Sequence, residues 1–124
     1  MRGLGIDLCD VRRIERALEN PRFLERYYTQ EERAYLRQRG QAAACSAAAM
    51  FAAKEAFLKA LGLGIGSVAL CDIGVSHEPG GAPAYRLTGE ALQRLGGGRA
   101  YLSLTHEAGM AAAVCVIEGE AEHA

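Results

Sequence analysis

The spacing of apolar residues predicts how the N-terminal part of this chain folds. Small and apolar residues alternate loosely over residues 4–9, which indicates a β-strand. Apolar positions then recur on one face of a helix over residues 11–19, and Asp10 immediately before it is a suitable N-cap. This helix must end before Pro21, because proline disrupts the interior of a helix.

A long helix is expected in the middle of the chain. Residues 41–62 are rich in alanine and leucine and contain no proline, and Gly62 can adopt the left-handed conformation that ends a helix. A shorter helix over residues 30–39 precedes it, because Thr29 and Glu32 have the spacing of a capping box. We interpret Glu32 as a charge that stabilises the N-terminus of this shorter helix.

The second half of the chain has the alternation and the turn residues of β-strands. Strands are expected at residues 71–77, 84–87, 99–105 and 110–117. A turn-rich segment at residues 78–83 joins the first two, and a short helix ending at Leu95 precedes the last two. The sequence therefore predicts an α+β fold in which a small antiparallel sheet packs around one long central helix.

Length and charge add to this picture. A chain of 124 residues forms one domain, which we expect over residues 1–118, followed by a short acidic tail at residues 119–124. The net charge of -1 is unevenly distributed: residues 1–59 carry 11 Lys and Arg against 8 Asp and Glu, whereas residues 60–124 carry 3 against 7. The N-terminal half is therefore the better candidate for binding an acidic partner.

Several classes of protein are disfavoured by the composition. Cys9, Cys45, Cys71 and Cys115 are widely separated and form no Cys-x-x-Cys pair, so we interpret them as reduced residues and not as disulfides or zinc ligands. No segment is long and apolar enough to span a bilayer, and the N-terminus does not resemble a signal peptide. A total charge near zero disfavours nucleic-acid binding. We expect a cytoplasmic protein.

Charged residues in apolar surroundings are the candidates for chemistry. Asp7 lies within the first strand, where it has no evident structural role, because Asp10 is the better helix cap. Glu55 and Lys59 are four residues apart and share one face of the central helix. From spacing alone, Glu55 and Lys59 could also be an ordinary surface ion pair. His106 ends the strand of residues 99–105, a position that by itself is more typical of a structural or surface histidine.

Four motifs occur together in this order: Gly-Ile-Asp-Leu at residues 5–8, Phe-Ala-Ala-Lys-Glu-Ala-x-x-Lys at 51–59, Gly-Leu-Gly-Ile-Gly at 62–66 and Ser-Leu-Thr-His at 103–106. Over nearly the whole chain this arrangement resembles the holo-acyl-carrier-protein synthases, which are small 4'-phosphopantetheinyl transferases. The resemblance implies transfer of 4'-phosphopantetheine from coenzyme A to a serine of apo acyl carrier protein, with release of adenosine 3',5'-bisphosphate, in fatty acid biosynthesis. It also implies a homotrimer with active sites between protomers, with which the apolar strand at residues 110–117 is consistent.

The same resemblance implies the roles of individual residues. Asp7 and Glu55 would be the ligands of Mg2+, and Lys59 would neutralise charge that develops on the phosphates. The general base would be either Glu55 or a magnesium-bound water that Glu55 orients. The residues expected to bind coenzyme A are Lys59, Gly66, Gly81, Pro83, Thr105 and His106. The basic residues expected to bind the acidic second helix of acyl carrier protein are Arg13, Arg16, Arg22 and Arg26.

Two positions depart from the pattern of this family. Met50 stands where an arginine commonly precedes the central motif, and Ala82 stands in place of a lysine in the loop near the adenosine end of coenzyme A. Each change removes a positive charge that could face a phosphate. Coenzyme A could therefore bind weakly, or Arg37, Arg39 or Arg86 could compensate. Two alternatives follow: a degenerate homologue that binds acyl carrier protein without modifying it, and a hydrolase that cleaves the pyrophosphate of coenzyme A with water.

Overall fold

The computed structural model describes residues 1–120, and residues 121–124, which belong to the predicted acidic tail, lie outside the described part. The helices are α1 (Val11–Ala17), α2 (Pro21–Tyr27), α3 (Gln30–Arg37), α4 (Ala43–Ala60) and α5 (Gly89–Leu95), with short 3-10 turns η1 (Gly40–Ala42) and η2 (Leu70–Asp72). The strands are β1 (Gly3–Asp10), β2 (Ile73–His77), β3 (Pro83–Leu87), β4 (Arg99–Glu107) and β5 (Met110–Glu118).

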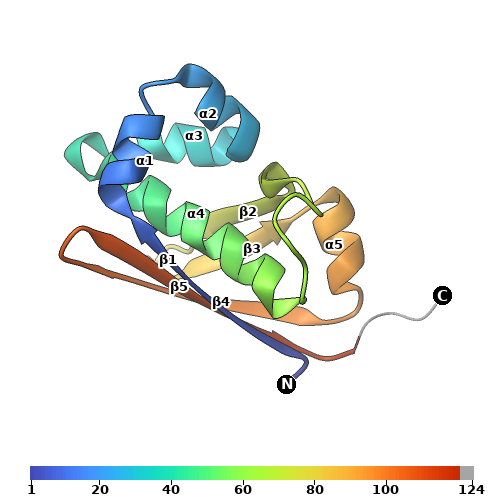
Figure 1. Ribbon diagram of the computed structural model, residues 1–124. Helices are drawn as coiled ribbons and strands as arrows, with labels where there is room; N and C mark the ends of the chain where they lie inside the picture. The colour runs from blue at the N-terminus through green and yellow to red at the C-terminus, as the bar shows by residue number, and fades with distance from the viewer. Residues whose placement is uncertain (121–124) are drawn as a thin grey trace.

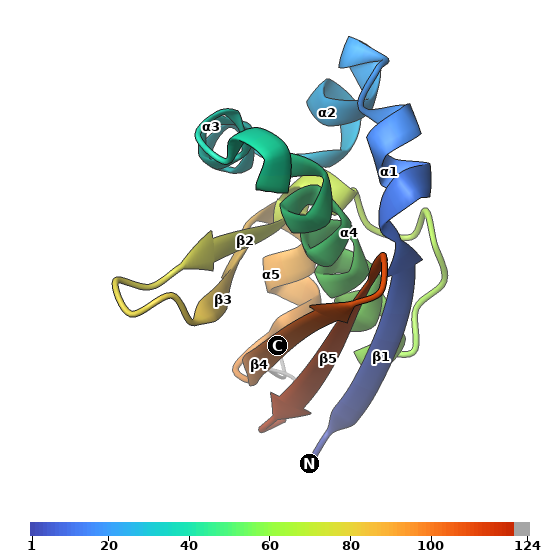
Figure 2. The same cartoon turned by 90° about the vertical axis from the view of Figure 1, so that its left-hand side faces the viewer.

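The long helix α4 lies across an antiparallel sheet with the strand order β1-β5-β4, and β2 and β3 form a separate hairpin beside α4 (Figures 1 and 2). The helices α1, α2 and α3 lie on the side of α4 that faces away from this sheet (Figure 1). The predicted α+β fold with one long central helix is confirmed. The division into a domain of residues 1–118 and a tail stays a prediction.

One helix was not predicted from the sequence. Residues Pro21–Tyr27 form α2, which begins with Pro21 in the first turn, and the side chain of Asn20 accepts a hydrogen bond of 3.0 Å from the backbone nitrogen of Arg22. Proline is favoured at the first position of a helix, and asparagine is favoured at the N-cap. The Asn20-Pro21 pair therefore indicates the start of a new helix as well as the end of the previous one.

Two glycines bring β1 directly against α4. A Cβ atom added to Gly5 would collide with the carbonyl oxygen of Ala56, and one added to Gly3 would collide with that of Ala60. Since successive residues of a strand point to opposite faces, Asp7 lies on the same face as these glycines. The close approach of the two backbones therefore places the Asp7 carboxylate beside the C-terminal half of α4.

Small residues form much of the buried surface of α4. Ala47, Ala52, Ala53 and Ala56 are fully buried, so neighbouring elements can pack closely against this helix. The hydroxyl of Tyr28 donates to the carbonyl oxygen of Ala47 at 2.7 Å, and the hydroxyl of Tyr85 donates to that of Ala53 at 2.6 Å. These two bonds satisfy phenolic hydroxyls that would otherwise be costly to bury.

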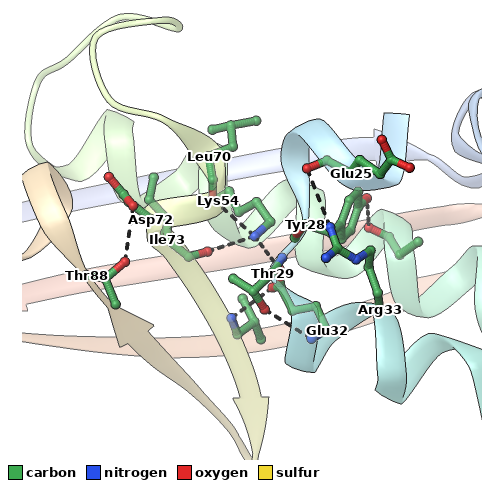
Figure 3. A network of polar contacts seen from close by, with 12 residues as sticks. Glu25, Tyr28, Thr29, Glu32, Arg33, Lys54, Leu70, Asp72, Ile73 and Thr88 are labelled. Carbon is green, nitrogen blue, oxygen red and sulfur yellow. Dashed lines mark hydrogen bonds and ion pairs between the residues drawn. The ribbon is translucent and has the colours of Figure 1, made fainter. Parts of the chain in front are cut away.

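A buried ion pair joins α3, α4 and the start of β2 (Figure 3). The ammonium of Lys54 donates to Glu32 Oε1 at 2.7 Å and to the carbonyl oxygens of Leu70 and Ile73 at 3.2 and 2.9 Å. Burial lowers the pKa of Lys54, an effect that the charge of Glu32 opposes. The second oxygen of Glu32 accepts from the backbone nitrogen of Val75 at 2.9 Å. Each partner is therefore satisfied by several hydrogen bonds in the interior.

Glu32 corrects one sequence-based interpretation. The predicted capping box with Thr29 is present, with bonds of 2.7 and 3.0 Å, so Glu32 does stabilise the N-terminus of α3. However, its side chain is only 1% exposed, and it is a core residue that holds Lys54, not a charge at the helix surface. The sequence could not indicate this, because the partner lies 22 residues away on another helix.

The face of the sheet that points away from α4 exposes apolar side chains. Leu4, Ile6 and Leu8 are 58, 67 and 62% exposed, and the register of β1 with β5 aligns them with Val116, Val114 and Ala112. Among the described residues, no helix covers this face (Figures 1 and 2). No helix in residues 1–120 is long and apolar enough to cross a membrane.

Candidate active site

Asp7 and Lys59 form an ion pair where β1 crosses α4. The ammonium of Lys59 lies 2.9 Å from Asp7 Oδ1 and also donates to the backbone carbonyl of Ile6 at 3.1 Å. The side chain of Lys59 is 53% exposed, whereas that of Asp7 is 13% exposed. The carboxylate is thus held at the wall of the site, and the ammonium extends from it toward solvent.

Glu55 completes a cluster of charges at this point. Partial burial raises the pKa of Glu55, and the nearby Asp7 carboxylate raises it further, while Lys59 and Arg13 act in the opposite direction. The three predicted catalytic residues are therefore brought together by the packing of β1 on α4. The alternative of a simple Glu55 to Lys59 surface pair does not describe this arrangement, because Lys59 forms its ion pair with Asp7.

The cluster is suited to a divalent cation that a substrate helps to bind. Asp7 and Glu55 are two carboxylates whose negative charges repel each other, and an additional cation would relieve that repulsion. Within residues 1–120 no group of three or more His, Cys, Asp or Glu side chains could enclose a metal ion. Mg2+ commonly uses only one or two protein carboxylates and takes its other ligands from waters and substrate phosphates. The residues present fit that pattern.

One basic residue of α1, Arg13, contributes to the electrostatics of this cluster. Arg13 donates to the sulfur of Cys9 at 3.7 Å, and its guanidinium lies 6.0 Å from the ring centre of Phe51. The charge of Arg13 partly offsets the rise in the pKa of Glu55. The remaining predicted carrier-binding residues, Arg16, Arg22 and Arg26, are exposed on α1 and α2.

A cleft of about 540 Å³ brings together four of the residues predicted to bind coenzyme A: Gly81, Pro83, Thr105 and His106. Its walls come from α3, the connection between α3 and α4, the first half of α4, the β2–β3 hairpin and the end of β4. Lys59 and Gly66, the other two predicted residues, are both described and do not line the cleft. One chain therefore presents four of the six predicted residues in the cleft and the other two outside it.

The three arginines that could replace the two missing positive charges lie in different surroundings. Met50 is 1% exposed and belongs to the core. Arg39 lines the cleft, whereas Arg37 does not. Arg86 lies against a second, smaller cavity and forms an exposed ion pair of 3.4 Å with Glu78.

The cleft also contains Tyr35 and His77, to which the sequence assigned no role, next to Arg39, which the sequence offered as a compensating charge. The rings of Tyr35 and His77 are stacked, with centres 4.4 Å apart and planes 6° from parallel. The guanidinium of Arg39 lies 5.4 Å from the ring centre of Tyr35. These residues come from α3, β2 and the connection before α4, so no local pattern could have revealed the stack.

Comparison with known proteins gives one consistent family. A model of the 4'-phosphopantetheinyl transferase superfamily matches residues 3–115. A holo-acyl-carrier-protein synthase of Treponema denticola is 48% identical over 120 residues, which are 94% of this chain and 98% of the relative. A holo-acyl-carrier-protein synthase of Myxococcus xanthus is 45% identical over 127 residues, which cover 98% of each chain.

Solved structures agree with these relatives. The holo-acyl-carrier-protein synthase of Bacillus anthracis, in complex with coenzyme A (3',5'-ADP), superimposes with a TM-score of 0.82 at 35% identity over 96% of this chain and 97% of that one. The enzyme of Helicobacter pylori in complex with coenzyme A gives a TM-score of 0.81 at 34% identity, covering 93 and 99% of the two chains.

Proposed function

This chain belongs to the holo-acyl-carrier-protein synthases of the 4'-phosphopantetheinyl transferase superfamily, and we propose that Asp7, Glu55 and Lys59 perform the transfer. The enzyme transfers 4'-phosphopantetheine from coenzyme A to a serine of apo acyl carrier protein, a step that serves fatty acid biosynthesis. The observation that carries the assignment of residues is the convergence of these three charged side chains where β1 packs on α4.

The reaction joins the serine oxygen to the β-phosphorus of coenzyme A and breaks the bond from that phosphorus to the bridging oxygen of the pyrophosphate. Adenosine 3',5'-bisphosphate leaves with the electron pair of that bond. Glu55 accepts the serine proton, directly or through a water that it orients. Lys59, which is half-exposed and anchored by Asp7, neutralises charge on the leaving phosphate.

Asp7 and Glu55 would hold Mg2+ at this position, with the substrate phosphates as further ligands. When bound, the ion would neutralise the pyrophosphate and favour cleavage of its bridging bond. The repulsion between the two carboxylates, which contributes to the raised pKa of Glu55, supports this assignment.

The carrier protein would dock on the basic helices. Arg13 lies next to the charge cluster, and Arg16, Arg22 and Arg26 extend the exposed positive surface along α1 and α2. An acidic helix bound across these guanidinium groups would bring its serine toward Glu55. The excess of basic residues in this half of the chain supports the same partner.

We also propose a homotrimer whose active sites lie between protomers. The apolar outer face of the sheet, which includes Ile6, supports association. Lys59 and Gly66 do not line the cleft that contains His106. This supports a shared site, because a neighbouring protomer could place its own Lys59 and Gly66 beside this cleft.

Ile6→Glu is expected to dissociate the trimer and to reduce transfer at least tenfold, because a carboxylate on this face would be buried without a partner. Light scattering would give the mass of three chains for the wild type and of one chain for the variant. Leu92→Glu on α5, where the native leucine is 51% exposed, is the matched control and should leave the mass and activity unchanged. A monomeric wild type would contradict the trimer.

The function is tested by the intact mass of an apo acyl carrier protein after incubation with this protein, coenzyme A and Mg2+. We expect a gain of one phosphopantetheine that a chelator abolishes. Binding of the carrier without a mass gain would support the non-enzymatic alternative. Release of adenosine 3',5'-bisphosphate in the absence of any carrier would support the hydrolase.

A further inference from the structure

Helix α2 carries Arg22 and Arg26, two of the four arginines proposed to bind the carrier protein, but the helix itself is little buried. None of its seven residues is fully buried, and both arginines are exposed. A helix of this length is marginal in water, because its few backbone hydrogen bonds do not offset the cost of nucleating it. Contacts with neighbouring elements must therefore hold α2 in position.

Aromatic rings hold one side of α2. The ring centre of Phe23 lies 5.7 Å from that of Tyr28 and 6.0 Å from that of Phe51 on α4. The side chain of Asn20 caps the first turn of the helix. These contacts fix one face and the N-terminal end of α2. They do not involve the carbonyl oxygens of its last turn, which lack partners within the helix.

Arg33 on α3 supplies a contact at the C-terminal end of α2 (Figure 3). Its Nη1 donates to the carbonyl oxygen of Tyr28, the C-cap residue of α2, at 3.2 Å, and lies 3.5 Å from that of Glu25 in the last turn. A guanidinium at these carbonyls also interacts favourably with the partial negative charge at the C-terminal end of a helix. The partly buried side chain of Arg33 is therefore bound within the molecule, unlike the exposed arginines of α2.

We propose that Arg33 is a positioning residue for the carrier protein: it fixes the C-terminal end of α2 so that Arg22 and Arg26 face an acidic helix together. This inference rests on the proposed function. Binding is tighter when the guanidinium groups are already held in place, because ordering them on binding would cost free energy. The guanidinium of Arg26 lies 5.4 Å from the ring centre of Tyr27, so its position depends on the last turn of α2.

Arg33→Met removes the hydrogen bonds at the end of α2 and keeps the apolar part of the side chain. Calorimetric titration with apo acyl carrier protein should show binding at least about threefold weaker than for the wild type, the size of one exposed ion contact. In transfer assays the KM for the carrier should rise by a similar factor, whereas kcat and the KM for coenzyme A should change by less than about twofold. A general loss of structure would not confine the effect to the carrier.

Two further variants separate positioning from direct contact. Arg94→Met is the matched control on α5, where Arg94 forms an exposed ion pair of 2.9 Å with Glu90, and it should leave carrier binding unchanged. In a chain with Arg22→Met and Arg26→Met, the addition of Arg33→Met should have little further effect, because Arg33 acts through those two residues. An additive loss would mean that Arg33 contacts the carrier itself, and this result would overturn the proposal.

Hydrogen exchange reports on the position of α2 without any carrier. The backbone amides of residues 25–28 should exchange faster in Arg33→Met than in the wild type, and those of α4 should exchange at the wild-type rate. Unchanged exchange in α2, or equal acceleration in both helices, would overturn the proposal, as would a wild type that does not bind the carrier. Absence of transfer by a wild type that binds the carrier would refute the proposed function, and the titrations would still decide the role of Arg33.

Discussion

Glu55→Gln is expected to lower the rate of phosphopantetheine transfer by about 10²- to 10³-fold, the range found when a general base or a group that stabilises charge is removed. Glutamine has nearly the shape of glutamate, but it can neither accept the serine proton nor contribute a charge to a metal site. The initial rate of mass gain of the carrier protein, measured at saturating coenzyme A and Mg2+, reports this loss. A variant that keeps more than half of the wild-type rate would exclude Glu55 from the chemistry.

The pH dependence of stability and of transfer rate distinguishes an effect on the reaction from an effect on folding. Because the pKa of Glu55 is raised above its ordinary value of 4.5, the native state binds this proton more tightly than the unfolded state. Its ionisation therefore makes stability fall as the pH rises from about 4.5 through the raised pKa, and this cost persists at neutral pH. Glu55→Gln removes the cost, so at neutral pH the variant should be at least as stable as the wild type. The wild-type transfer rate should also decrease at acidic pH, where protonated Glu55 can neither bind Mg2+ nor accept the serine proton.

Lys54→Met, unlike Glu55→Gln, is expected to destabilise the fold, with a loss of about 3–5 kcal/mol in the free energy of unfolding. Methionine fills a similar volume, but it leaves the Glu32 carboxylate buried without its cation and leaves the carbonyl oxygens of Leu70 and Ile73 without a donor. Urea denaturation at one fixed protein concentration measures the change, because association would otherwise shift the apparent stability. Adding Glu32→Gln should recover part of the loss, since it removes the unpaired charge.

Lys59→Met is the matched control on the same helix. Its ion pair with Asp7 involves a half-exposed ammonium, so its removal should change the free energy of unfolding by less than about 1 kcal/mol. The same change should nevertheless reduce transfer strongly, because Lys59 faces the phosphates in the proposed mechanism. Equal losses of stability in the two lysine variants would contradict the distinction between a structural lysine and a functional one.

The sequence predicted most of what is local in this fold. Periodicity and capping residues located β1, α1, α3, α4 and the later strands, and Gly62 does end α4 in a left-handed conformation. The motif at residues 51–59 indicated Glu55 and Lys59, but it gave no sign that Lys54, which immediately precedes Glu55, is fully buried. Burial of Lys54 depends on Glu32, and helical spacing carries no information about a partner on another helix.

The candidate site was predictable where a residue type is unusual for its element. An aspartate inside a strand and a charged pair on an apolar helix stand out, and the structure brings them together. The cleft was less accessible to such reasoning, because Tyr35 and His77 are ordinary residues for their positions and Arg39 was only one of three candidate arginines. Only the tertiary arrangement of α3, β2 and α4 makes them neighbours.

The close contact of β1 with α4 at Gly3 and Gly5 has a consequence for catalysis. With no side chains between the two backbones, the strand and the helix cannot slide past each other without a collision. We therefore expect Asp7 on the strand and Glu55 and Lys59 on the helix to keep their relative positions when substrates bind. The site is preorganised: the entropy of bringing these groups together is lost once, during folding, and not again at each turnover.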